Sequence, residues 1–288
     1  HPAPSVIVFT VLSGAGFGFL AFLGLGFPAP SGWVAFVLWG LGYGLAVAGL
    51  LASTFHLGHP ERAWRAFSQW RTSWLSREAW AAVGTLLLLA PMALSDWLGL
   101  GWPRAIGVLG ALGCAVTVLC TAMIYAQIRA VPRWHDWVTP VLFAAFAITG
   151  GAILSGRAVL AAFACLGLAA VLLLAFRRGE GRFAAAGQTL ATATGLPHVA
   201  GVFELPHTGG NYLLREMIFS VGRKHVAKLR VIAVGLAGLV PGAVLMLLPG
   251  HAVTVALAAM LHLAGAFAAR WLFFAQAEHV VGLYYGRR

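Results

Sequence analysis

Apolar runs of about twenty residues recur along the chain, and this pattern constrains the fold more than any other feature. A helix of that length crosses the hydrocarbon core of a bilayer and satisfies its own backbone hydrogen bonds there. Residues that stop helices separate several runs, for example Pro28 to Pro30 and Pro249-Gly250. The pattern predicts a bundle of eight transmembrane helices, at residues 5–27, 33–57, 77–95, 104–128, 137–155, 157–176, 229–248 and 252–276.

The composition supports an all-α integral membrane protein. Of the 288 residues, 60% are hydrophobic and 9% are charged, whereas roughly a quarter of residues are charged in soluble domains. We treat residues 1–288 as a single polytopic membrane domain. The three cysteines, Cys114, Cys120 and Cys165, lie inside apolar runs and are too few for a four-thiolate iron–sulfur cluster.

Arginine and lysine are concentrated in alternate loops. They follow the second, fourth and sixth predicted helices and end the chain, whereas Arg104 and Arg157 fall on the other side. Because loops rich in these residues stay in the cytoplasm, we predict that both termini and the basic loops are cytoplasmic. The net charge of +11 therefore reflects topology. We expect no nucleic-acid binding, which would need a basic face on a soluble module.

Two extramembrane segments are predicted on the basic side. Residues 57–76 interleave tryptophans and a phenylalanine with arginines, a pattern typical of an interfacial amphipathic helix. Residues 177–228 are too polar to span and form a cytoplasmic connecting loop. A loop of this length is either a solvated connection or a docking surface for a peripheral partner.

A histidine, several arginines and a carboxylate crowd the end of the second predicted helix, in the segment STFHLGHPERAWRAFSQWRTSWLSRE. His56 precedes Gly58 and Pro60, where the helix should break at the membrane surface. Glu78 begins the third predicted helix. It is either a proton acceptor or an acid favoured by the positive end of the helix dipole.

This segment resembles the signature of a known family. The match is to the membrane anchor subunit of dimethyl sulfoxide reductase and related molybdenum oxidoreductases, and it rests on His56-Leu57-Gly58, Pro60, Arg62, Ala63 and Ser76-Arg77-Glu78. A looser similarity extends over the whole chain and favours the sulfite-oxidising branch. The resemblance implies a multi-pass protein of the bacterial cytoplasmic (inner) membrane with two partners. They are a ferredoxin-like iron–sulfur subunit and a catalytic subunit that carries a molybdenum bis-pterin cofactor.

The resemblance also implies that His56 and Glu78 take part in quinone binding. A quinol site needs groups that titrate near neutral pH beside each oxygen and an apolar slot for the tail. Other polar residues lie at the same helix ends, so the predicted site for ubiquinone or menaquinone comprises His56, Gly58, His59, Arg62, Glu78, Tyr125, Arg129, Arg270, Glu278 and His279.

Haem and metal ions are not expected. No two predicted helices place histidines at one depth, as paired haem ligands would require. His262 lies alone in the middle of the last predicted helix. It is either a hydrogen-bonded packing residue or a functional group, because ionisable residues inside a bilayer are costly to keep there.

We expect the chain to hold the quinone site and no catalytic residues, and to exchange electrons between the quinone pool and the iron–sulfur subunit. The favoured complex is a cytoplasm-facing sulfite dehydrogenase that reduces quinone in an electroneutral cycle. Alternatives are the anchor of a dimethyl sulfoxide, other S- or N-oxide, or polysulfide reductase that oxidises menaquinol, and a passive anchor without a quinone site. A secondary transporter of an anionic solute is a further alternative. It predicts broken helices at matching positions of two inverted halves, and one break, after His56, is evident.

Overall fold

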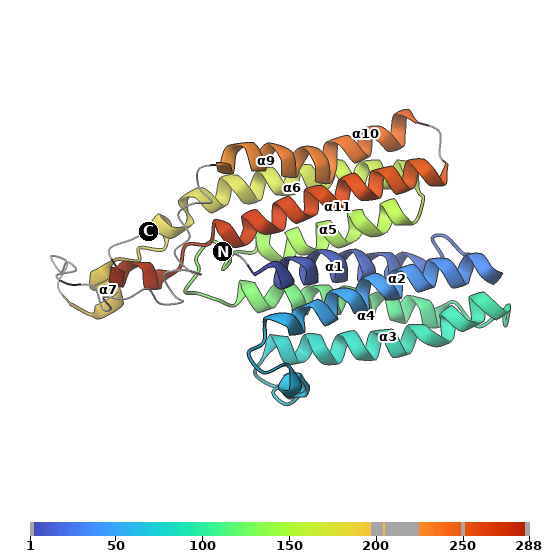
Figure 1. Cartoon of the computed structure of the whole chain (residues 1–288), viewed down its shortest axis with the longest axis horizontal. Helices are drawn as coiled ribbons and strands as arrows, with labels where there is room; N and C mark the ends of the chain where they lie inside the picture. The colour runs from blue at the N-terminus through green and yellow to red at the C-terminus, as the bar shows by residue number, and fades with distance from the viewer. Residues whose placement is uncertain (1–2, 197–203, 205–224, 249–250, 286–288) are drawn as a thin grey trace.

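The computed structural model describes residues 3–196, 204, 225–248 and 251–285, which form an elongated helical bundle (Figure 1). In these residues all regular structure is helical and no strand occurs. The main helices are α1 (Pro4–Gly24), α2 (Gly32–Ala52), α3 (Trp74–Leu98), α4 (Ala105–Ala126), α5 (Val138–Leu154), α6 (Ala158–Ala185), α9 (Val226–Val234), α10 (Val240–Leu247) and α11 (Ala252–Ala275).

Seven of the described helical stretches are long and apolar enough to cross a membrane, with α9 to α10 counted as one stretch. The predicted helix at 137–155 corresponds to α5, which is shorter, with 17 residues. The prediction of membrane-spanning helices is therefore confirmed for seven stretches, and α5 is an apolar helix of lesser length.

Two boundaries differ most from the predicted ones. The sixth helix continues past residue 176 to Ala185, because Arg178 and Arg182 on the added turns bond to the loop between α4 and α5. The second helix ends at Ala52, and the chain tightens into the 3₁₀ helix η1 (Ser53–His56) before Gly58. Short 3₁₀ turns are common at the ends of α-helices.

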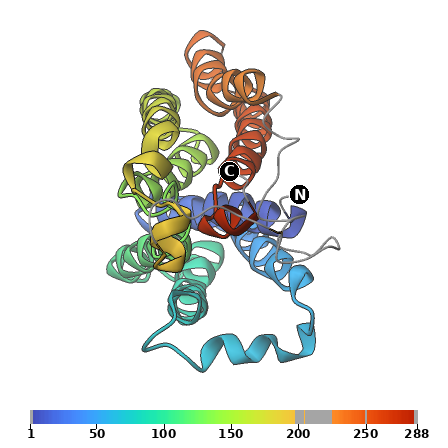
Figure 2. The same ribbon diagram turned by 90° about the vertical axis from the view of Figure 1, so that its left-hand side faces the viewer.

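Helix α1 lies at the centre of the bundle. Seen along its axis, α1 separates α2, α3 and α4 from α5, α6, α9, α10 and α11 (Figure 2). A Cβ atom at Gly16 would overlap the backbone of Ala46 in α2, and one at Gly18 would overlap the carbonyl oxygen of Ala147 in α5. Small residues allow helix backbones to approach closely where lipid provides no hydrophobic driving force. The glycines of α1 therefore allow close packing on both α2 and α5.

The span formed by α9 and α10 is interrupted by a π-helical segment, η4 (Gly235–Leu239). Pro241 follows it and has no N–H to donate to the carbonyl of Ala237, four residues earlier. The Nδ1 atom of His262, on α11, lies 2.7 Å from that carbonyl oxygen. Of the two roles left open for His262, the structure therefore supports the hydrogen-bonded packing role.

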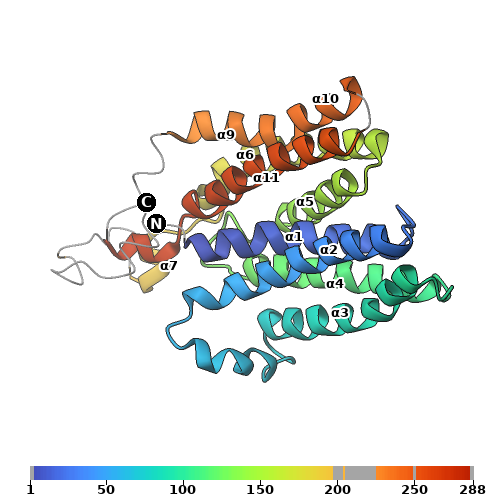
Figure 3. The ribbon, with the colours of Figure 1, turned by 45° about the vertical axis from the view of Figure 1, so that its right-hand side comes forward.

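The described parts of the segments rich in arginine lie together at one end of the bundle, which we call the polar end. Residues 197–203 and 205–224 of the predicted connecting loop lie outside the described residues. At the polar end, Figure 1 shows the ends of α2, α4, α6 and α11, together with the start of α1 and the short helix α7 (Leu190–Thr194). The predicted amphipathic segment contains the 3₁₀ helix η2 (Pro60–Phe67), which lies to the side of the bundle (Figure 3). Another 3₁₀ helix, η5 (Val280–Tyr285), follows α11.

Candidate functional site

A carboxylate lies buried near the polar end of the bundle, on the second turn of α3. Ser73 caps this helix, with its side chain accepting a hydrogen bond from the backbone N–H of Ser76. Glu78 follows on the face that packs on α4, and it is 3% exposed. The hydroxyl group of Thr121, on α4, lies 2.6 Å from Oε1 of Glu78. Helix packing thus brings together two polar groups that are 43 residues apart.

The Thr121 hydroxyl can serve Glu78 in two protonation states. It lies 3.0 Å from the carbonyl oxygen of Thr117, one turn earlier, as well as 2.6 Å from Glu78. A hydroxyl group has one hydrogen to donate and lone pairs to accept. It donates to an ionised Glu78, and it can donate to Thr117 while accepting from a protonated Glu78. Rotation of one hydroxyl group therefore lets Thr121 stabilise either protonation state of Glu78.

Tyr125 lies one turn further along α4, inside a cluster of aromatic rings. Its ring stacks on Phe143 of α5 with centroids 5.6 Å apart. Three further rings contact it edge-on at 5.5 Å: Trp134, Phe273 and Phe274. These contacts join α4, α5, α11 and the α4–α5 loop around one buried phenol.

Arg270 completes this cluster from α11 and is 2% exposed. Its Cζ atom lies 3.6 Å from the centroid of Phe143, on whose ring Tyr125 also stacks. Among the described residues, Nη1 of Arg270 has no hydrogen-bond partner. Phe143 stabilises the guanidinium group by a cation–π contact, which is stronger where water is absent. Arg270 and Tyr125 thus share the ring of Phe143, and Glu78 lies beside Thr121, one turn from Tyr125 along α4.

Comparisons with known proteins agree with this architecture. The family described as DMSO reductase anchor subunit (DmsC) matches residues 1–276. The chain belongs to this anchor-subunit family. It is also similar to a sulfite dehydrogenase subunit of Allochromatium vinosum, with 33% identity over 326 aligned positions that cover 99% of this chain and 98% of that protein. No solved structure gives a significant match.

Membership of the anchor-subunit family confirms the resemblance that was inferred from the residues between His56 and Glu78. The protein is a multi-pass membrane anchor subunit of the molybdoenzyme type, and its family works with catalytic and iron–sulfur subunits in a redox complex. The described residues contain no group of three or more histidine, cysteine or acidic side chains placed to hold a metal ion.

Three of the predicted quinone-site residues are buried near the polar end: Tyr125 and Arg270 contact the ring of Phe143, and Glu78 contacts Thr121 on the same helix as Tyr125. Three other predicted residues, Gly58, His59 and Arg62, lie on or next to η2 and are outside this buried region. Gly58 and Arg62 are exposed, and Nδ1 of His59 pairs with Oε1 of Glu61 at 2.9 Å with both side chains about two-thirds exposed. The backbone of His56 ends η1, whereas its side chain lies outside the part of the chain that the structure describes.

The remaining predicted residues lie at the surface of the polar end. Arg129 is exposed in the α4–α5 loop. Glu278 and His279 are half-buried just before η5, which is joined to the same loop by the N–H of Val280 donating to the carbonyl of Ala130. Partial burial lowers the pKa of His279, since desolvation disfavours its charged form. Neutral imidazole is therefore favoured there.

Sequence reasoning missed two members of the cluster, Thr121 and Phe143. Both look like ordinary residues of an apolar helix, because threonine and phenylalanine are common in transmembrane spans. A weak signal existed for Thr121, which is four residues before Tyr125 and so shares its helix face. No comparable signal pointed to Phe143, whose role depends on which helix packs beside α4.

Proposed function

We propose that this protein is the quinone-reactive anchor subunit of a molybdenum oxidoreductase, which exchanges electrons between the membrane quinone pool and an iron–sulfur partner. The favoured complex is a sulfite dehydrogenase on the cytoplasmic face, in line with the name of the relative from Allochromatium vinosum. The main support for a quinone site in this chain is the buried, hydrogen-bonded pair of Glu78 and Thr121 at the polar end. A buried carboxyl group inside a membrane bundle is costly, so its presence points to a function.

The chemistry assigned to the chain is proton exchange and orientation of the quinone ring. Interconversion of quinone and quinol moves two electrons and two protons, and the electrons pass to or from the partner subunits. Glu78 exchanges a proton with the quinone oxygen, and rotation of the Thr121 hydroxyl stabilises whichever form results. The rings around Tyr125 supply the apolar surface on which the quinone head packs. His56, at the end of η1, is the proposed partner for the second quinone oxygen.

The proposal includes a topology of eight spans with the polar end in the cytoplasm. Helix α5 is about 26 Å long at 1.5 Å per residue, which is near the hydrocarbon thickness. It packs between α1 and α6, both of which are long enough to span. Because quinone and sulfite would react on the same face, no charge crosses the membrane in the cycle. Turnover in proteoliposomes that generates a membrane potential would contradict this arrangement.

A reductase is the second candidate, favoured by the family description as the anchor of DMSO reductase. In that case menaquinol gives its protons to Glu78 and electrons flow outward to an S-oxide, N-oxide or polysulfide. A transporter is less well supported. The irregular segment η4 lies within the seventh span, whereas η1 lies at the end of the second, so the two are not at matching positions.

The test is quinone-coupled turnover of the purified complex with Glu78→Gln. Glutamine keeps the size and hydrogen bonding of the side chain but holds no exchangeable acid proton. We expect a fall of about a hundredfold, within the range for general acid–base groups, with unchanged activity toward an artificial dye. Glu61→Gln, an exposed acid of η2, is the matched control and should stay within about twofold of wild type.

Two results would separate the parts of this proposal. Equal quinone turnover in the Glu78→Gln complex and the wild type would remove the quinone site from this cluster. Absence of turnover with sulfite, together with turnover of an S-oxide by the same complex, would replace the sulfite assignment and leave the quinone site standing.

A further inference from the structure

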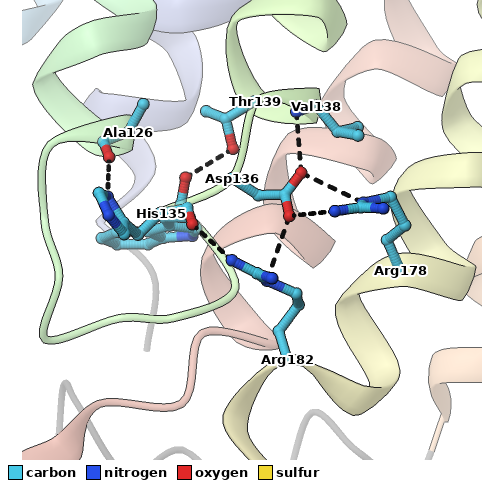
Figure 4. A network of polar contacts seen from close by, with 8 residues as sticks. Ala126, His135, Asp136, Val138, Thr139, Arg178 and Arg182 are labelled. Carbon is cyan, nitrogen blue, oxygen red and sulfur yellow. Dashed lines mark hydrogen bonds and ion pairs between the residues drawn. The ribbon is translucent and has the colours of Figure 1, made fainter. Parts of the chain in front are cut away.

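The polar end carries a second polar cluster, built around Asp136 in the α4–α5 loop (Figure 4). Arg178 donates to this carboxylate from Nη2 at 3.0 Å and from Nε at 3.3 Å. Arg182, one turn further along α6, places its Nε 3.1 Å from the same group. The N–H of Val138 also donates to Oδ1, at 3.0 Å. One carboxylate therefore holds two guanidinium groups of α6 and the first turn of α5.

These bonds fix the positions of both arginines. Arg182 also donates to the carbonyl of His135 at 2.9 Å, and Arg178 lies over the ring of Trp137 at 5.4 Å. Burial alone would raise the pKa of Asp136, but the hydrogen bonds from Arg178 and Val138 and the charges of both arginines outweigh it and lower the pKa. The carboxylate is thus ionised at neutral pH and holds the two cations in place.

A pocket opens beside this cluster, between α5, α6 and α11. Its cavity volume is ≈ 40 Å³, and the space around it amounts to ≈ 500 Å³ when open solvent is counted. Its polar part is lined by Asp136 and by three arginines, Arg133, Arg178 and Arg182. The remaining lining is mostly apolar and includes Leu142, Leu172, Ala175, Phe176 and Phe273. The pocket is therefore amphipathic, with cations at one end and hydrocarbon at the other.

The charges in this lining do not cancel. Three guanidinium groups face the pocket against one carboxylate among the described lining residues. Arg133 reaches it over Gly179, where any Cβ atom would meet its guanidinium group at 2.6 Å, and donates to Oε1 of Gln276 at 3.1 Å. Burial, followed by the charge of Arg230, lowers the pKa of Arg133 to about 10, although Glu278 and Glu180 oppose this. The group remains a cation at neutral pH.

We propose that this pocket binds one anionic phospholipid, with its phosphate at the three arginines and an acyl chain between α5 and α6. The excess of positive charge selects an anion, and the apolar wall selects one that carries a hydrocarbon chain. Trp137, whose ring Arg178 covers, is 56% exposed, as expected for a residue at the membrane–water interface. Basic pockets between membrane helices are suited to lipid headgroups. A neutral quinone head would leave the excess charge uncompensated.

Native mass spectrometry of the whole complex tests this proposal directly. The complex is extracted in mild detergent and mixed with phosphatidylglycerol or phosphatidylcholine of identical acyl chains. We expect one tightly retained phosphatidylglycerol per anchor subunit and at least about tenfold weaker retention of phosphatidylcholine. Arg178→Gln combined with Arg182→Gln should weaken the retention of phosphatidylglycerol about tenfold, because each arginine beside an anionic headgroup adds to the electrostatic attraction that holds the lipid.

Two further variants separate a specific effect of the pocket from a general loss of positive charge and from a failure of the complex to assemble. Arg65→Gln combined with Arg71→Gln removes two exposed arginines from the same end and should leave retention unchanged. Ala175→Phe fills the apolar part of the pocket while keeping its charges, and should abolish retention even if the double arginine variant fails to assemble. Equal retention of both lipids by the wild type, or unchanged retention in Ala175→Phe, would overturn the proposal. The test does not depend on quinone turnover.

Discussion

Replacement of Thr121 by valine tests the proton-exchanging pair with almost no change of shape. The side chain is buried, and valine differs from threonine by a methyl group in place of the hydroxyl. The change removes the hydroxyl 2.6 Å from Glu78 without opening a cavity. An ionised carboxylate in the bundle would then lose this hydrogen bond.

The expected magnitude follows from the strength of that bond. A hydrogen bond to a charged group contributes about 1.5–3 kcal/mol, and each 1.4 kcal/mol is a factor of about ten in rate. If an ionised Glu78 takes up the proton, quinone-coupled turnover should fall by roughly ten- to a hundredfold. Thr121→Ser keeps the hydroxyl and loses the methyl group, so it should retain most of the turnover despite a small packing defect.

The assay is steady-state turnover of the complex with a short-chain quinone, with dye activity measured in parallel. Dye activity should be the same in wild type, Thr121→Val and Thr121→Ser, because the dye bypasses the membrane subunit. Turnover that falls equally in both variants would indicate a packing effect. Full turnover in Thr121→Val would refute the proposed role of this hydroxyl.

Three other predictions concern the stability of the fold. Gly18→Val should prevent assembly or cost several kcal/mol, because its side chain would overlap the backbone of Ala147; thermal unfolding in detergent measures this. His262→Leu should cost about 1–3 kcal/mol, since the carbonyl of Ala237 would lose its imidazole partner; unchanged unfolding would contradict this interpretation of η4. The lowered pKa of Asp136 means that its ionised form stabilises the folded state above the unfolded pKa of about 3.9. That contribution should disappear as pH falls through the lower folded pKa, so the stability difference from Asp136→Asn should shrink on acidification and not at alkaline pH.

Much of the candidate site could be predicted because its chemistry lies in residues that are unusual for a membrane span. Glu78, Arg270 and Tyr125 stand out in apolar surroundings, and counting residues along each helix places them at the same end. Their partners could not be predicted in this way. Thr121 and Phe143 acquire their roles from the rotation of α4 and the position of α5, and these depend on close contacts of α1 at Gly24, against Gly107 of α4, and at Gly18, against Ala147 of α5.

The sequence by itself determined the class of fold, the approximate spans and the end at which charge gathers. Each of these depends on local properties, namely the length of apolar runs and the preference of arginine for the membrane surface. The tertiary structure decided which polar groups meet, as with Glu78 and Thr121 or Asp136 and Arg178. It also placed His262 on the carbonyl of Ala237. Such pairs join distant parts of the chain, and their geometry is set by the order and rotation of packed helices.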